Sequence, residues 1–98
     1  MTLSDPTGYT PRVAIVTGSA RGIGYAIAHR LADDGVDVVI NDLSSNQDKI
    51  DDVVEEIKKK GRRSIGIAAD ISKEDEVKAM LDKAVEELGS LDVVSVYY

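Results

Sequence analysis

The sequence predicts an α/β domain built on a doubly wound parallel sheet, and three observations lead to this prediction. Short apolar runs alternate with amphipathic stretches of helical period along the whole chain. The runs at 13–16 and 36–40 are almost continuously apolar, as in strands covered on both faces. Right-handed crossovers between such strands predict the order 3-2-1-4, with the first two helices on one face and the third on the other.

The first strand is expected over residues 13–16 and the first helix over roughly 22–34. Gly35 follows this helix and can take a left-handed cap conformation. The apolar residues of the helix recur at helical spacing: Ile23, Ala26, Ile27 and Leu31. The chain therefore begins with a strand, a tight turn and a helix.

The second strand is expected over residues 36–40, with its carboxyl end at Asn41 and Asp42. A polar loop follows, in which Ser45 and Asp48 have the spacing of a helix-capping pair. The second helix then presents an apolar face and ends at three lysines and Gly61; its apolar residues are Ile50, Val53, Val54 and Ile57.

The third strand is expected over residues 64–69, at an edge of the sheet, because Gly66 interrupts it. Ser72 and Asp75 repeat the capping spacing before a third helix that ends at Gly89. Its apolar stripe comprises Val77, Met80, Leu81, Ala84, Val85 and Leu88. Residues 91–96 open a fourth strand.

Length and composition allow one small domain. The 98 residues carry a formal net charge of −6, which disfavours nucleic acid as a partner. The sequence contains no cysteine, which suits the cytoplasm and excludes thiolate metal sites, and it has no apolar run long enough to span a membrane. Residues 1–11 are polar and contain two prolines, so we expect a flexible arm rather than a signal peptide.

The glycine-rich turn after the first strand indicates a phosphate ligand. Gly18, Gly22 and Gly24 let the chain reverse without side chains, so that backbone N–H groups at a helix start can face an anion. A dinucleotide is the ligand that this arrangement favours. A tight turn with no ligand is the alternative, although three glycines exceed what a plain turn requires.

Thr17 directly precedes Gly18, and the order T-G-x-x-x-G-x-G resembles the short-chain dehydrogenase/reductase family. The resemblance implies a Rossmann-like fold and a nicotinamide dinucleotide cofactor. It further implies that the cofactor contacts the turn and the ends of the second and third strands. The residues carried over are Gly18, Ser19, Arg21, Gly22, Ile23, Gly24, Asp42, Leu43, Asp70 and Ile71.

Asp42 favours NAD over NADP. A carboxylate at the end of the second strand can accept hydrogen bonds from the adenosine ribose hydroxyls. A 2'-phosphate about 5 Å from it would be repelled by roughly 3 kcal/mol at an effective dielectric constant of about 20. Arg21 could instead attract that phosphate, but an exposed ion pair contributes at most about 1 kcal/mol. Simple alternatives are a turn acid for Asp42 and a solvated side chain for Arg21.

In the family, an acid at the position of Asp70 hydrogen-bonds the adenine amino group, with the backbone N–H of Ile71 beside it. Asp70 could instead only help to start the third helix. His29 lies on the polar side of the first helix, and we assign it no function.

The resemblance runs from about Arg12 to Val94, where the sequence follows the family's L-D-V-L-V-N-N-A-G segment. Val96 and Tyr97 then stand where that segment has asparagines, and the family's serine and Y-x-x-x-K pair are absent from the sequence. No catalytic residue is therefore predicted. We expect residues 12–98 to form a truncated, amino-terminal part of a dehydrogenase that is inactive and poorly stable alone, and the tail 95–98 to result from truncation.

The resemblance implies hydride transfer between nicotinamide and a small alcohol or ketone, in an enzyme that is usually a homo-oligomer. An acid at the position of Asp42 is similar to the acid found in NAD-dependent diacetyl or acetoin reductases and butanediol dehydrogenases. It also fits sugar and steroid dehydrogenases. Two alternatives remain: a non-catalytic module that binds a dinucleotide or other subunits, and a NADP-dependent 3-oxoacyl-type reductase that uses Arg21, Ser44 and Ser45.

Overall fold

The computed structural model describes residues 12–95 of the chain. The arm expected over residues 1–11 and the tail residues Val96, Tyr97 and Tyr98 lie outside the described residues.

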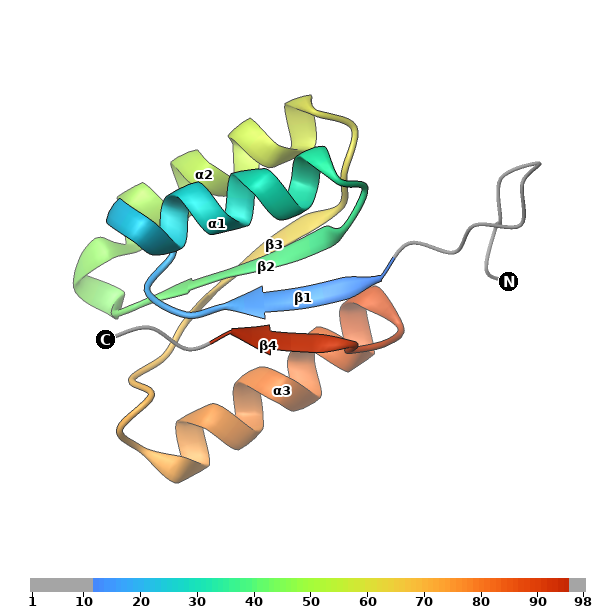
Figure 1. The fold of residues 1–98 in the computed structure, drawn as a ribbon. Helices are drawn as coiled ribbons and strands as arrows, with labels where there is room; N and C mark the ends of the chain where they lie inside the picture. Colours follow the sequence, from blue (N-terminus) through green and yellow to red (C-terminus); the bar gives the residue numbers. More distant parts are fainter. Residues whose placement is uncertain (1–11, 96–98) are drawn as a thin grey trace.

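A parallel sheet forms the centre of the fold (Figure 1). Its order is β3-β2-β1-β4, and every neighbouring pair is parallel, with Val16 opposite Ile40 between β1 and β2. The strands are β1 (Val13–Val16), β2 (Asp37–Asp42), β3 (Ser64–Ala68) and β4 (Val93–Ser95). Parallel pairing places all four carboxyl ends at one edge of the sheet.

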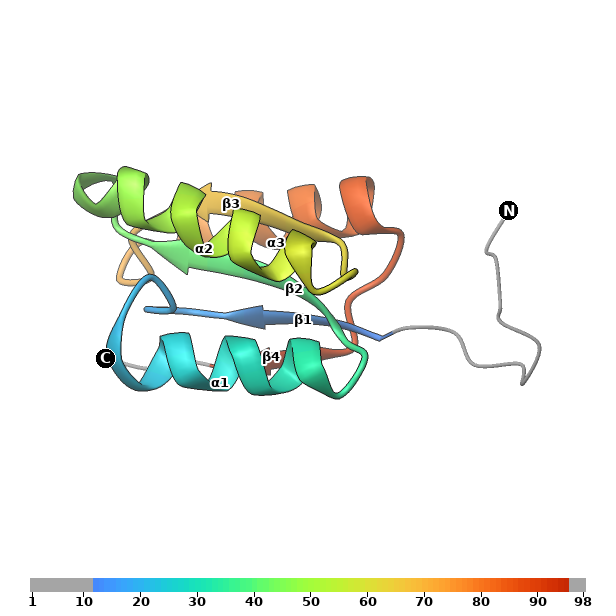
Figure 2. The same ribbon diagram turned by 90° about the horizontal axis from the view of Figure 1, so that it is seen from above.

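Three α-helices cover the two faces of this sheet. Figure 1 shows α1 and α2 on one face and α3 on the other, as the expected crossovers require, and Figure 2 shows α1 and α2 running side by side. The helices are α1 (Gly22–Asp33), α2 (Gln47–Lys59) and α3 (Glu74–Leu88), and a short 3-10 turn, η1 (Ser44–Asn46), precedes α2.

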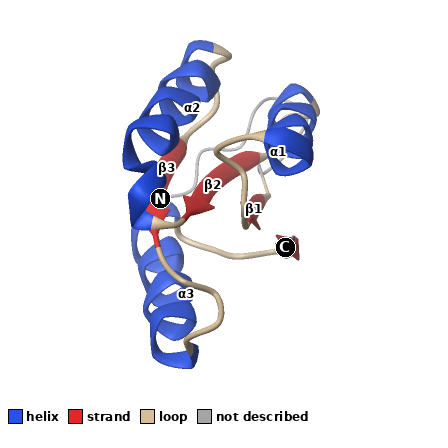
Figure 3. Cartoon of the chain, turned by 90° about the vertical axis from the view of Figure 1, so that its left-hand side faces the viewer, coloured by secondary structure: helices blue, strands red, loops and turns tan. Residues whose placement is uncertain are grey.

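Two apolar clusters fill the spaces between the layers seen edge-on in Figure 3. Val16, Val38 and Ile40 point towards α1 and α2, whereas Val13, Ile15 and Val39 point towards α3. All six side chains are fully buried. The continuous apolar character of β1 and β2 therefore arises because both faces of these strands are covered, as the sequence predicts.

The second strand ends later than expected because of its pairing with β3, and Gly66 in β3 has a role that the sequence did not predict. The second strand extends to Asp42 because Asn41 and Asp42 pair with Ile67 and Ala68 of β3. Gly66 in β3 marks a close helix contact, since a Cβ atom there would lie 2.5 Å from Cγ2 of Ile50 in α2. Gly66 therefore allows α2 to pack closely on β3, whatever its effect on the stability of the strand itself.

Both expected capping pairs are wrong. Ser45 lies within η1, and neither α2 nor α3, both inside the described range, has a side-chain cap hydrogen bond at its N-cap residue, which is Asn46 for α2 and Lys73 for α3. The Ser72 hydroxyl donates to Asp70 instead, at 2.7 Å. The spacing of serine and acid is a local sequence pattern. Which group the serine hydroxyl binds depends instead on the turn that follows the preceding strand.

The third helix buries only part of its expected apolar stripe. Met80, Ala84 and Leu88 are buried, but Val85 is 45% exposed. Gly89 ends this helix, as expected, with φ of 86°. Gly35 has φ of 88°, so the left-handed conformation expected at Gly35 is confirmed.

Candidate functional site

The turn between β1 and α1 is held in place by β2. Ser19 donates its backbone N–H to the carbonyl of Asn41 at 2.9 Å, and its buried hydroxyl donates to the carbonyl of Val16 at 2.7 Å. The Asn41 N–H donates in turn to the Ser19 hydroxyl at 3.1 Å. The turn is thereby fixed at the carboxyl edge of the sheet.

Glycine is required in this turn for two different reasons. Gly18 and Gly22 have φ of 63° and 64°, a region that other residues enter only with strain. Gly24 has a negative φ, but a Cβ atom there would lie 2.4 Å from the carbonyl oxygen of Gly18. The first turn of α1 thus packs directly on the backbone of the preceding turn.

The partial positive charge at the amino end of α1 is not offset by an acidic side chain in its first turn. Within α1, all of which the structure describes, the first turn contains no acidic residue, and Arg21 before it makes no side-chain cap. The first turns of α2 and α3 each contain at least one acid. The free N–H groups of a helix start attract an anion, and the helix dipole adds roughly 0.3–1 kcal/mol. Arg21 and Ile23 are exposed at this end.

Asp42 lies beside the turn, at the end of β2. Its Oδ2 atom accepts from the backbone N–H of Ala20 at 3.2 Å. Its Oδ1 atom accepts from the backbone N–H of Leu43 at 2.9 Å and from the Asn46 amide at 3.0 Å. Oδ2 therefore retains capacity for a further donor. Leu43, the next residue, is 48% exposed at the same edge.

Asp70 follows β3 at this edge. The Ala69 N–H donates to the Asp42 carbonyl at 3.0 Å, which joins the ends of the two strands. The Oδ1 atom of Asp70 accepts from the hydroxyl and the N–H of Ser72, and these two hydrogen bonds lower the pKa of the Asp70 carboxyl. Asp70 thus organises the turn before α3, as the helix-start alternative expects, while its Oδ2 atom faces no partner within the described residues.

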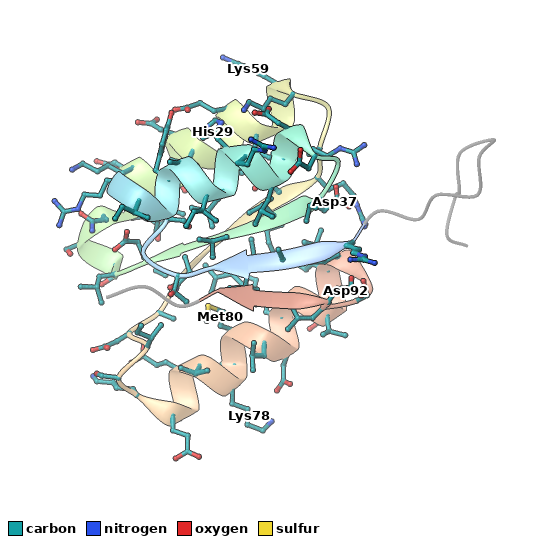
Figure 4. All side chains as sticks on the ribbon, in the orientation of Figure 1. His29, Asp37, Lys59, Lys78, Met80 and Asp92 are labelled. Atoms are coloured by element: carbon teal, nitrogen blue, oxygen red, sulfur yellow. The ribbon has the colours of Figure 1, made fainter. Side chains whose placement is uncertain are left out.

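All of the carried-over residues therefore come from three neighbouring segments at one edge of the sheet: residues 18–24, 42–43 and 70–71. The acids Asp37 and Asp92, at the opposite ends of β2 and β4 (Figure 4), do not belong to this site. His29 contacts Glu56 on α2 instead.

Residues 12–96 match the family model described as short chain dehydrogenase. The chain belongs to the short-chain dehydrogenase family. The expected family and the α/β fold with a parallel sheet are therefore confirmed.

Two curated relatives illustrate the match. A short-chain dehydrogenase/reductase of Armillaria gallica is 52% identical over 83 residues, which are 85% of this chain and 32% of the relative. A 3-oxoacyl-(acyl-carrier-protein) reductase of Staphylococcus epidermidis is 48% identical over 81 residues, 83% of this chain and 33% of the relative. This short-chain dehydrogenase chain spans about a third of the length of the curated relatives that it matches.

Solved structures show the same fold. A blue fluorescent protein from a metagenomic library, in complex with NADPH, has a TM-score of 0.81 and 39% identity, over 85% of this chain and 34% of that chain. A short chain dehydrogenase/reductase of Burkholderia phymatum, in complex with NAD, has a TM-score of 0.79 and 28% identity, over 86% and 29%.

Sequence reasoning missed two polar residues that build this edge. Asn41 is buried and donates its side-chain amide to the carbonyl of Ile67 at 2.9 Å, and Asn46 binds Asp42. An asparagine that ends an apolar strand was the available signal for Asn41. Across residues 12–95 no cluster of acids and histidine could hold a metal ion, and no helix in that range is long and apolar enough to cross a membrane.

Proposed function

We propose that this chain forms the adenosine-binding part of a nicotinamide dinucleotide site in a short-chain oxidoreductase. The observation that carries the proposal is the uncapped amino end of α1, packed through Gly24 onto a turn in which Gly18 and Gly22 have positive φ. Such a turn exposes backbone N–H groups without side chains in front of them, which is the arrangement that a pyrophosphate requires.

The other residues of the edge would hold the remainder of the ligand. Asp42 accepts from the ribose hydroxyls through the free capacity of Oδ2, while Ile23 and Leu43 offer exposed apolar surface beside the turn. Asp70 accepts from the adenine amino group through Oδ2, and the Ile71 N–H donates to the ring. The contacts of Oδ1 of Asp70 with Ser72 fix the orientation of that carboxylate.

NAD is the favoured form of the cofactor. The Asp42 carboxylate is held by three donors at the end of β2, where a 2'-phosphate would lie, so NADP meets like charge. Arg21 is exposed and has no ion pair within residues 12–95, so its attraction for a phosphate is screened by water.

The proposed reaction is hydride transfer between a bound nicotinamide and a small alcohol or ketone, of the kind that diacetyl or acetoin reductases use. The nicotinamide would supply or accept the hydride when bound. Residues 12–95 contribute binding and orientation of the adenosine half. We further propose that the enzyme acts as a cytoplasmic homo-oligomer, which the absence of cysteine in the sequence suits.

Calorimetric titration of the chain with NADH, NADPH and ADP tests this proposal. We expect all three to bind, NADH more tightly than NADPH, and we expect Asp42→Ser to reduce that difference by about tenfold or more. Asp34→Ser, an exposed change at the far end of α1, is the matched control and should leave the ratio unchanged. Failure of NADH and ADP to bind would refute the dinucleotide site.

A NADP-dependent 3-oxoacyl-type reductase is the second candidate, supported by the 48% identity to the staphylococcal reductase and by Ser44 and Ser45 directly beyond Leu43. A wild-type preference for NADPH in the same titration would select this candidate. Turnover of a carbonyl substrate is not expected of this chain under either candidate, because no catalytic residue is predicted in it.

A further inference from the structure

The first helix packs on the sheet through small residues. Gly24, Ala28 and Ala32 are its buried positions, spaced four apart along one face. Small side chains allow close approach but interlock little with the sheet, and the larger α1 side chains that pack on the same apolar cluster, Tyr25, Ile27 and Leu31, are only partly buried. By contrast α2 is anchored by four buried branched side chains: Ile50, Val53, Val54 and Ile57.

A cluster of three polar side chains joins the two helices. Tyr25 of α1 donates its hydroxyl to Oε1 of Glu56 in α2 at 2.6 Å, and Nε2 of His29 lies 3.0 Å from the same oxygen. The rings of Tyr25 and His29 lie 4.5 Å apart. The His29 side chain is only 17% exposed, so the cluster is partly shielded from water. The face of α1 that carries His29 is visible in Figure 4.

Charged groups around the cluster favour the ionised carboxylate. The Tyr25 hydroxyl, then His29 and Lys59, lower the pKa of Glu56, and the hydrogen bond to Glu56 raises the pKa of Tyr25. Asp33 and Arg30 lie on α1 near His29, and Lys60 beyond α2 pairs with Asp33 at 2.8 Å. Glu56 is thus an acceptor that stays charged at neutral pH and serves both donors of α1.

The cluster lies next to the phosphate-binding turn. Tyr25 directly follows Gly24, and its N–H donates to the Arg21 carbonyl at 3.3 Å, which closes the first turn of α1. We infer that Glu56 is a positioning residue for the dinucleotide site: it holds Tyr25 and His29 and thereby fixes the first turn of α1, whose N–H groups face the pyrophosphate. The inference rests on the proposed function.

Binding of ADP and adenosine by the full chain tests this role. Glu56→Ala should weaken ADP about tenfold, because two hydrogen bonds that orient the turn are lost, and should leave adenosine, which has no phosphate, within twofold. Glu56→Gln keeps an acceptor oxygen and should restore most of the ADP affinity. The matched control is Glu55→Ala, since Glu55 is exposed and, among residues 12–95, pairs only with Lys58 on its own helix. Equal losses for ADP and adenosine would indicate general destabilisation and overturn the inference.

A measurement without ligand separates this inference from the proposed function. Amide hydrogen exchange of Tyr25 and Ala26 should accelerate about tenfold in Glu56→Ala and in Tyr25→Phe relative to Glu55→Ala, while exchange at Val53 and Val54 should change little. Unchanged exchange at Tyr25 and Ala26 would overturn the positioning role even if ADP binds. Accelerated exchange in a chain that does not bind ADP would show that the cluster fixes the turn but that the proposed ligand is wrong.

Discussion

The carboxylate of Asp42 accepts a hydrogen bond from the backbone N–H of Ala20, with Oδ2 3.2 Å from the nitrogen. Ala20 belongs to the glycine-rich turn after β1, whereas Asp42 ends β2, so one contact joins the negative charge of the site to the turn that would hold the phosphates. A change at Asp42 therefore alters both the charge and the support of the turn.

Asp42→Asn separates these two effects, because asparagine keeps the shape but has one acceptor oxygen and no charge. NADPH affinity should rise roughly ten- to hundredfold through lost repulsion. NADH affinity should fall only a few-fold, because one of the backbone contacts to Ala20 or Leu43 is lost. Fluorescence titration of both reduced cofactors gives the two constants, with Asp34→Asn as control. A parallel fall in both affinities would contradict the charge argument.

Gly24→Ala should damage the site more than Gly22→Ala. A Cβ atom at Gly24 meets the backbone oxygen of Gly18 at 2.4 Å, and backbone cannot rotate away, so α1 must shift. At Gly22 a Cβ atom meets nothing within 4 Å, and the cost is the positive φ alone, roughly 1–2 kcal/mol. Denaturant unfolding and ADP titration of both variants measure the difference. A weaker effect at Gly24 than at Gly22 would be inconsistent with the close packing of the turn.

Gly66→Ala should destabilise the fold by about 1–3 kcal/mol, because the new methyl group overlaps Cγ2 of Ile50. Ile50→Leu removes that β-branched methyl and should recover about 1 kcal/mol or more in the double variant. A double-mutant cycle by denaturant unfolding measures this coupling. Additive single and double changes would show that α2 does not press on β3 at this point.

The raised pKa of Tyr25 predicts that the folded protein loses stability at alkaline pH. Its pKa is raised above the ordinary value of about 10 by the hydrogen bond to Glu56. A group with a raised folded-state pKa contributes its full stability below the unfolded pKa, and loses it as the pH rises through the folded pKa. The melting temperature should fall between about pH 9 and about pH 11 by more in the wild type than in Tyr25→Phe. Identical pH profiles would show that the contact with Glu56 contributes nothing to folding.

The stabilising contribution of Glu56 is lost at acid pH instead. Its pKa is lowered, chiefly by the Tyr25 hydroxyl, so its contribution is complete above the unfolded pKa of about 4.3 and is lost as the pH falls through the lower folded value. Glu56→Gln should therefore lose less stability than the wild type on acidification below about pH 4. Thermal unfolding between about pH 3 and about pH 6 measures the difference, with Glu55→Gln as control. If the pH profile of Glu56→Gln coincides with that of the wild type, the Glu56 carboxylate does not contribute to the stability of the fold.

The sequence by itself determined the elements and the turn of this protein. Continuous apolar runs predicted β1 and β2, helical spacing predicted α1, α2 and α3, and the three glycines located the turn, because periodicity and backbone freedom are properties of neighbouring residues. Only the tertiary structure decided which partners the polar groups take. Asp42 binds Ala20, Asp70 binds Ser72 instead of leaving it to cap α3, and Tyr25 reaches Glu56 on another helix. The contacts of Asp42 and Tyr25 depend on where separate strands and helices come to lie against one another, and no local pattern in the chain records that. The contact of Asp70 with Ser72 is local, but the spacing of serine and acid did not show which group Ser72 binds.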